Sequence, residues 1–410
     1  MKKLILENNI PIVLKENKNT PRIAITFYLK INKPEQTPGE YSLLNRLLMQ
    51  GTKTRTSEQI AVELDENAIE CGCEMKHDFI RFKLLCLNED IEKSLELLSD
   101  MIENSTMTEI EKEKIKLKGE IEADLDSPKA KTLDAFYKTL YEGHTYGHTY
   151  TLILENIDSI NKENIEKIYK DILENSPKVI SVAGEFEESR ILELFNKYFA
   201  GIKNGNIQES TIPIPVLKES KVVKLKKEDA SQAQIIQGWL LPTIYSKDYA
   251  AVMLLNTILG ASGLSSRLFV ELRDKKGLAY VVRSSYEIFN NVANFSVYIA
   301  TEPKNIKTSL EGFKIELDKI KNTLIGEEEL ENAKNNLIGK REFFTETNLQ
   351  QSSLIAFYED KNLGCDFEEK LVQMVKNVTA QDIMDVANNY IKEPNVLTIL
   401  APEEYLQFTG

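Results

Sequence analysis

Residues 263–286 read GLSSRLFVELRDKKGLAYVVRSSY, and the pattern predicts a helix at Ser265–Asp274. The tripeptide Val270-Glu271-Leu272 in this helix recurs as Val62-Glu63-Leu64 in a second predicted helix, at Ser57–Cys71. Each of the two helices follows a strand and a helix and precedes another strand. The sequence therefore predicts that one block of structural elements occurs twice along the chain.

The two halves of the chain share one order of predicted elements: a strand, two helices, a strand, a long charged helix, a helix and a strand. In the first half these elements are predicted at Arg22–Ile31, Tyr41–Gln50, Ser57–Cys71, Phe79–Leu87, Glu109–Asp124, Asn161–Leu173 and Val179–Ala183. In the second half they are predicted at Gln232–Leu241, Lys247–Leu259, Ser265–Asp274, Asn294–Ala300, Glu327–Arg341, Ala380–Ile391 and Val396–Leu400. Strands of period two combined with helices of period 3.6 indicate an α/β or α+β fold. Because the repeat is too long for a solenoid, we interpret it as a duplicated domain.

The boundary between the halves is predicted near residues 202–220. Asn204-Gly205, Pro213 and Pro215 interrupt regular structure there, and polar residues fill the gaps. The predicted parts of the chain are a first domain, a linker and a second domain, at residues 1–202, 203–220 and 221–410.

The composition is that of a globular protein. Of the 410 residues, 42% are hydrophobic and 28% are charged, which excludes a disordered, collagen-like or coiled-coil chain. Acidic residues (64) exceed basic ones (51), so the formal net charge is −13. Proteins that neutralise nucleic-acid phosphates usually have a basic excess, and a negative field also disfavours anionic membrane surfaces. We therefore expect neither nucleic acid nor a membrane as a partner.

The cysteines and the N-terminus favour a cytoplasmic protein. Four cysteines in a chain of this length do not make a disulfide scaffold, so we expect buried thiols in a reducing compartment. The N-terminal apolar stretch is interrupted by Glu7 and two Asn residues, unlike the apolar region of a signal peptide. The longest uncharged run, Tyr249–Ser266, contains Asn256, Thr257 and two Gly residues, and it is more typical of a buried helix than of a membrane span.

The sequence offers few residues for independent hydrolytic chemistry. It contains three His residues, at His77, His144 and His148. The last two lie in GHTYGHT, which we interpret as a loop, with capping or packing favoured over metal binding. His77, at the entrance of a strand, is expected to be structural. The chain also lacks the Gly-x-Ser-x-Gly elbow of serine hydrolases and the Walker A motif of nucleotide-binding proteins.

Over essentially its whole length, the chain resembles the M16 metallopeptidase family, which includes pitrilysin and the mitochondrial processing peptidase. Residues 263–286 are similar to the signature of the family's C-terminal domain, in which an Arg and a Tyr seven positions apart contact the substrate. The resemblance implies this role for Arg273 and Tyr280. Further similarity lies at residues 144–160, 182–186 and 256–260.

The sequence departs from the family at the zinc motif. Active members carry His-x-x-Glu-His on the first helix of the N-terminal domain, and its flanking residues remain here as Gly39 and Gly51-Thr52. The three chemical positions hold Ser42, Asn45 and Arg46. A guanidinium has no lone pair to donate to a metal, and an amide does not act as a general base. Glu120 matches the family's third ligand, but one carboxylate does not hold a catalytic zinc, so we expect a solvated charge on a helix.

The resemblance implies two tandem homologous domains, each with a mostly antiparallel sheet and helices packed on one face. It also implies a non-catalytic subunit of a heterodimeric zinc peptidase, which contributes Arg273 and Tyr280 to the cleavage of unfolded peptides. No zinc is expected in this chain and no peptidase activity by itself, because the His-x-x-Glu-His partner would supply the metal. Two alternatives remain open. One is an inactive homodimeric binding or scaffold protein, and the other is an independent enzyme with a different site.

Overall fold

The computed structural model describes residues 1–206 and 211–407, in two compact units. The first unit comprises Met1–Gly119, Leu152–Ile212 and Glu342–Glu368, and the second comprises Glu120–Thr151, Pro213–Arg341 and Glu369–Gly410. Each unit therefore includes a segment from the other half of the sequence. The linker predicted at residues 203–220 separates the two homologous halves of the sequence, which is a different division from that into the two units. The predicted division therefore stays a prediction.

The first unit is built on a six-stranded sheet with the order β1-β2-β6-β3-β5-β4. Its strands are β1 (Lys2–Ile5), β2 (Pro11–Glu16), β3 (Arg22–Lys30), β4 (Glu70–Met75), β5 (Phe79–Leu87) and β6 (Lys178–Gly184). Its helices are α1 (Glu40–Leu47), α2 (Ser57–Glu66), α3 (Ile91–Asn104), α7 (Lys162–Asn175), α8 (Glu188–Tyr198) and α12 (Asn348–Asp360). The residues of α4 (Ile110–Leu125) and α6 (Tyr150–Asn156) are divided between the two units. Strands β2 and β6 run parallel, and the remaining neighbours in this sheet run antiparallel.

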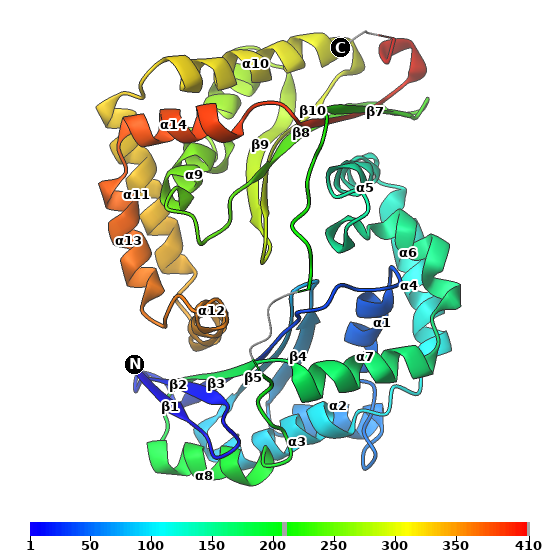
Figure 1. Cartoon of the computed structure of the whole chain (residues 1–410), viewed down its shortest axis with the longest axis vertical. Helices are drawn as coiled ribbons and strands as arrows, with labels where there is room; N and C mark the ends of the chain where they lie inside the picture. The colour runs from blue at the N-terminus through cyan, green and yellow to red at the C-terminus, as the bar shows by residue number, and fades with distance from the viewer. Residues whose placement is uncertain (207–210, 408–410) are drawn as a thin grey trace. The chain divides into compact units, whose positions relative to one another are not determined.

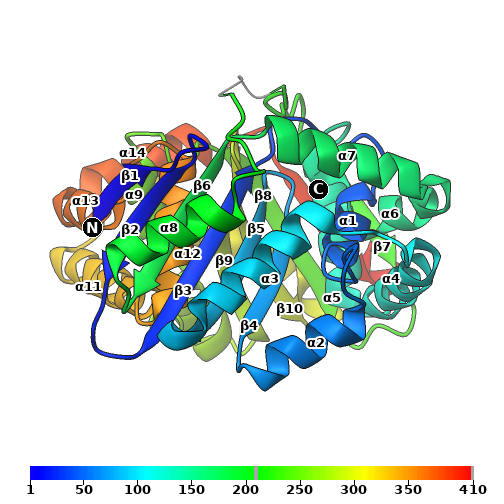
Figure 2. The ribbon, with the colours of Figure 1, turned by 90° about the horizontal axis from the view of Figure 1, so that it is seen from below.

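Helices cover both faces of this sheet. On one face, the ring of Phe27 in β3 lies 5.5 Å from that of Phe199, just after α8. Figure 2 shows α3 and α8 lying across the strands. On the other face, the hydroxyl of Thr26 lies 2.9 Å from that of Ser352. Ser352 belongs to α12, and Figure 1 shows this helix beside the first sheet. Because successive strand residues point to opposite faces, α12 and the end of α8 pack on opposite sides of β3.

The second unit is built on a five-stranded sheet with the order β7-β11-β8-β10-β9. Its strands are β7 (Lys221–Lys226), β8 (Ala233–Leu241), β9 (Ala279–Ile288), β10 (Ala293–Thr301) and β11 (Val396–Ala401). Its helices are α5 (Pro128–Leu140), α9 (Tyr249–Asn256), α10 (Ile306–Asn322), most of α11 (Glu327–Phe343), most of α13 (Phe367–Asn377) and α14 (Ala380–Tyr390). Two π-helical segments, Thr257–Ala261 and Phe269–Asp274, lie between α9 and β9. Strands β7 and β11 are parallel, and the other neighbours in this sheet are antiparallel.

Helix α5 reaches this sheet from the first half of the sequence and packs on β8 and β11 (Figure 1). A glycine in β8 makes the close approach possible. A Cβ atom at Gly238 would lie 2.5 Å from the ring of Phe136, which is fully buried on α5. The absence of a side chain at Gly238 therefore provides the space that Phe136 fills.

The predicted fold class is confirmed: each unit has a mixed but mostly antiparallel sheet with packed helices. In addition, each sheet has a helix from the other half of the sequence on its second face. This helix is α12 in the first unit and α5 in the second. Among residues 1–206 and 211–407, no helix has the length and apolarity needed to cross a lipid bilayer.

Candidate functional site

Helix α1, which carries three of the predicted site residues, begins at a turn that is held by several hydrogen bonds. Its N-cap, Gly39, has a φ of 104°, a left-handed conformation that favours glycine. The carboxylate of Glu35 accepts hydrogen bonds from the N–H groups of Gly39 (3.1 Å) and Tyr41 (2.7 Å). The carboxylate of Glu40 accepts in return from the N–H groups of residues 36 and 37. Two buried carboxylates thus fix the start of the helix.

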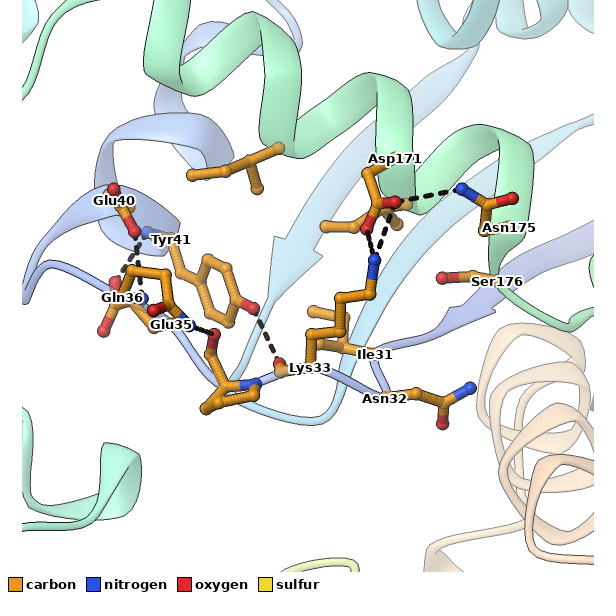
Figure 3. Close-up of a pocket in the computed structure, with 13 residues that line it drawn as sticks. Ile31, Asn32, Lys33, Glu35, Gln36, Glu40, Tyr41, Asp171, Asn175 and Ser176 are labelled. Atoms are coloured by element: carbon orange, nitrogen blue, oxygen red, sulfur yellow. Dashed lines mark hydrogen bonds and ion pairs between the residues drawn. The ribbon is translucent and has the colours of Figure 1, made fainter. Parts of the chain in front are cut away.

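A pocket of about 120 Å³ lies beside this turn, between residues 31–41 and α7 (Figure 3). The Lys33 ammonium lies 2.6 Å from Asp171, which also accepts from the side chain of Asn175. The Tyr41 phenol donates to the Lys33 carbonyl over 3.0 Å. Burial and the neighbouring Glu35 raise the pKa of Tyr41, which therefore stays protonated. These polar groups join α1 to α7. We therefore interpret the polar lining of the pocket as contacts that hold α1 in place.

The positions aligned with the zinc motif are used for internal contacts. The Asn45 side-chain oxygen accepts a 2.9 Å hydrogen bond from the N–H of Met75 in β4. Arg46 Nη1 lies 3.4 Å from Glu113 Oε2, and the Glu113 side chain is only 3% exposed. Lys116 binds the other Glu113 oxygen at 2.6 Å. Where active members have a metal ligand, this chain has a permanent cation beside a buried carboxylate.

The remaining residues at these positions lack the chemistry of a metal site. Ser42 is half-buried on α1, and Glu120 is exposed on α4, two helical turns after Glu113. Within the described part of the chain, no group of three or more His, Cys, Asp or Glu side chains could hold a metal ion. A serine, an amide and a guanidinium do not form a zinc donor set, so the residues present do not fit this metal.

The environment of His144 supports the predicted capping role. His144 Nδ1 accepts a 3.1 Å hydrogen bond from the N–H of Tyr146, and Nε2 lies 2.8 Å from the carbonyl of Pro213. With Nδ1 as acceptor and Nε2 as donor, the ring is in one neutral tautomer. The imidazole is 7% exposed and packs 4.5 Å from the Tyr146 ring. Both nitrogens are therefore occupied by backbone groups.

The structure brings Arg273 and Tyr280 together. Arg273 lies in the last π-helical turn and Tyr280 near the start of β9. Gly277, with a φ of 63°, reverses the chain between them, and its N–H donates to the Arg273 carbonyl over 2.9 Å. The guanidinium carbon of Arg273 consequently lies 4.7 Å from the centroid of the Tyr280 ring. A cation stacked on an aromatic face at this distance is a favourable arrangement.

The Arg273–Tyr280 pair presents hydrogen-bond donors to solvent. Tyr280 is 76% exposed, which is unusual for a large aromatic residue. No carboxylate of the described residues forms an ion pair with Arg273, and the neighbouring Glu271 binds Lys275 at 2.7 Å. The guanidinium N–H groups and the phenol are thus available to oxygen acceptors such as peptide carbonyls.

Sequence reasoning overlooked a third member of this group, Phe269. The guanidinium carbon of Arg273 lies 4.4 Å from the centroid of the Phe269 ring, closer than to the ring of Tyr280. The available signal was the spacing of four residues between Phe269 and Arg273, which places both on one side of a helix.

Comparisons with known proteins match both halves of the chain to one family. The model described as insulinase, peptidase family M16, matches residues 12–151, and that described as peptidase M16 inactive domain matches residues 159–337. An uncharacterized zinc protease of Rickettsia felis is 24% identical over 421 residues, which cover 98% of both chains.

Two solved structures support the fold. A protease from Helicobacter pylori has a TM-score of 0.87 and 23% identity, covering 98% of this chain and 99% of that one. A peptidase M16 inactive domain from Pseudomonas fluorescens has a TM-score of 0.88 and 20% identity, covering 98% of both chains.

Proposed function

The chain belongs to the M16 peptidase family, and we propose that it is the non-catalytic subunit of a heterodimeric zinc peptidase. Its partner would carry His-x-x-Glu-His and cleave unfolded peptides. The observation that carries this proposal is the contrast between two groups of residues. Arg273 stacks on the exposed Tyr280 and has no acidic partner among the described residues, whereas Arg46 is paired with Glu113.

The chemistry of α1 argues against hydrolysis by this chain alone. The Arg46 guanidinium has no lone pair to donate to a metal, and the Asn45 amide cannot take a proton from water. The Asn45 side-chain oxygen also accepts a hydrogen bond from the N–H of Met75, and this bond directs the Asn45 side chain toward β4. The metal and the general base would therefore be the partner's.

In this proposal Arg273 and Tyr280 bind the substrate backbone. The guanidinium offers several N–H groups in one plane, and the phenol adds an O–H donor. Together they can hold adjacent carbonyl oxygens of an extended peptide without reading its side chains. Donors fixed before the reaction also stabilise negative charge that develops on a carbonyl oxygen. The pair would thus contribute to both peptide binding and turnover.

The test is an assay with a quenched, unfolded peptide. The chain alone, a His-x-x-Glu-His paralogue alone and their mixture are compared, each with and without a zinc chelator. We expect turnover to rise strongly only in the mixture and to be abolished by the chelator.

Chelator-sensitive turnover by the chain alone would show the proposal wrong and support an independent enzyme. A mixture no more active than the paralogue, together with a homodimer that binds peptide, would favour an inactive binding or scaffold protein. A Lys276→Ala variant is the matched control for changes at Arg273, because it removes an exposed positive charge from the same turn.

A further inference from the structure

Arg267 and Arg273 lie six residues apart, and different kinds of contact hold their side chains. Arg267 donates from Nε and Nη2 to the two carboxylate oxygens of Glu329, both at 2.7 Å. This bidentate pair uses the donors of Arg267 internally. Arg273 instead contacts aromatic rings, those of Phe269 and Tyr280. Aromatic contacts hold a guanidinium through its face and leave its N–H groups available.

The two rings that contact Arg273 differ in how firmly they are placed. Tyr280 is 76% exposed, so its ring is held on few sides. Phe269 is partly buried and lies on the same π-helical segment as Arg273, four residues earlier. Leu268, which caps the start of this segment, and Leu272 within it are fully buried and anchor the backbone. Phe269 is therefore the more rigid of the two contacts.

We propose that Phe269 is a positioning residue for Arg273. Its ring holds the guanidinium plane beside Tyr280 while the N–H donors stay available to a peptide carbonyl. Without the ring, Arg273 would sample several rotamers and lose the geometry that the pair needs. This inference rests on the proposed function, because it concerns how Arg273 is held for substrate.

The experiment measures kcat and KM of the assembled pair for Phe269→Leu and Phe269→Tyr, each alone and with Arg273→Ala. We expect Phe269→Leu to lower kcat/KM by between about twofold and thirtyfold, the range of a cation–π contact. Phe269→Tyr keeps the ring and should stay within about twofold of the wild type. In the Arg273→Ala background, Phe269→Leu should have no further effect, since its action passes through Arg273.

The outcomes separate this inference from the proposed function. A loss with Arg273→Ala but none with Phe269→Leu would overturn the positioning role and leave the function standing. An equal loss from Phe269→Leu in both backgrounds would also overturn it, because the ring would then act on the fold. No loss with Arg273→Ala would overturn the proposed function itself. Thermal unfolding checks each variant, and Phe269→Met, closer in volume, replaces Phe269→Leu if that variant does not fold.

Discussion

Arg46 Nη1 lies 3.4 Å from Glu113 Oε2 at the position where active relatives have a zinc ligand. Glu113 is almost fully buried, and a buried carboxylate is costly without a compensating positive charge. Arg46 supplies that charge permanently, whereas a metal can dissociate. The positive charge beside Glu113 is therefore part of the chain itself, supplied by Arg46 together with Lys116.

This pair leads to a stability prediction. Arg46→Met should lower the free energy of unfolding by ~1–3 kcal/mol, because Glu113 would keep only Lys116 as a cation. Adding Glu113→Leu should recover much of the loss, and Arg46→Lys should lose less than Arg46→Met. Urea unfolding of the three variants measures this. A single Arg46→Met variant as stable as the wild type would contradict the structural role.

Restoring the motif residues alone should not restore activity. In the triple variant Ser42→His, Asn45→Glu and Arg46→His, the chain gains two imidazoles and a carboxylate. Metal ligands need neighbouring groups that orient them, and here the neighbouring groups Met75 N–H and Glu113 contact Asn45 and Arg46 instead, so we expect the new ligands to lack such support. We expect no zinc-dependent peptidase activity from the triple variant alone. Metal content after dialysis and turnover of a quenched peptide test this, and chelator-sensitive turnover would show the prediction wrong.

Removal of donors from the proposed substrate contact should impair the assembled peptidase. Arg273→Ala or Tyr280→Phe should lower turnover by about 100-fold to 1,000-fold if the donors act on a developing oxyanion, equivalent to ~2.7–4 kcal/mol. Neither change should alter the unfolding temperature much, because Tyr280 is exposed and Arg273 is only partly buried. Steady-state kinetics of the mixture provide the measurement. Unchanged turnover in both variants would remove the assigned role.

Lys178, at the start of β6, should make stability depend on alkaline pH. The side chain is 3% exposed, and burial lowers its pKa from 10.5 to about 8. Between about pH 8 and 10.5 the unfolded chain binds the proton more often than the folded chain, so stability should rise with pH there. Below pH 8 both states are protonated, and the burial of the charge costs roughly 3 kcal/mol.

Lys178→Met should therefore be more stable than the wild type at pH 7, and its stability should lack the rise between pH 8 and 10.5. The Ser176 carbonyl that Lys178 binds keeps the N–H of Gly205 as a donor, so it is not left unsatisfied. Chemical unfolding at several pH values measures both effects. Lys170→Met, which changes an exposed lysine on α7, is the control, and an identical pH profile for the two variants would refute the prediction.

A substitution at Gly238 can test how closely α5, which comes from the first half of the sequence, packs on the second sheet. Gly238→Ala would place a Cβ atom 2.5 Å from Phe136 on α5 and 2.9 Å from the carbonyl oxygen of Phe295. We expect a loss of ~1–3 kcal/mol in the free energy of unfolding. Gly72→Ala, in strand β4, meets no atom within 4 Å and should be neutral or slightly stabilising. Equal effects of the two substitutions would contradict the close packing of α5.

Much of the fold followed from local patterns in the sequence. The period of two in Arg22–Ile31 predicted β3, and the helical period near Tyr41 predicted α1. What local periodicity could not predict is that both faces of β3 are buried, because the residues that cover one face belong to α12, more than 300 positions later. The contact of Arg46 with Glu113 is equally non-local, because it joins α1 to α4.

The sequence by itself determined the duplicated α/β architecture, the family resemblance and the absence of zinc-ligand chemistry at Ser42, Asn45 and Arg46. These properties follow from periodicity and from the functional groups of single residues, which do not depend on distant parts of the chain. Only the tertiary structure decided that α5 and α12 pack on sheets of the other half, that Glu113 is the partner of Arg46, and that Phe269 contacts Arg273. Packing brings residues that are far apart in the sequence into contact. The number of residues between them does not predict which of them will meet.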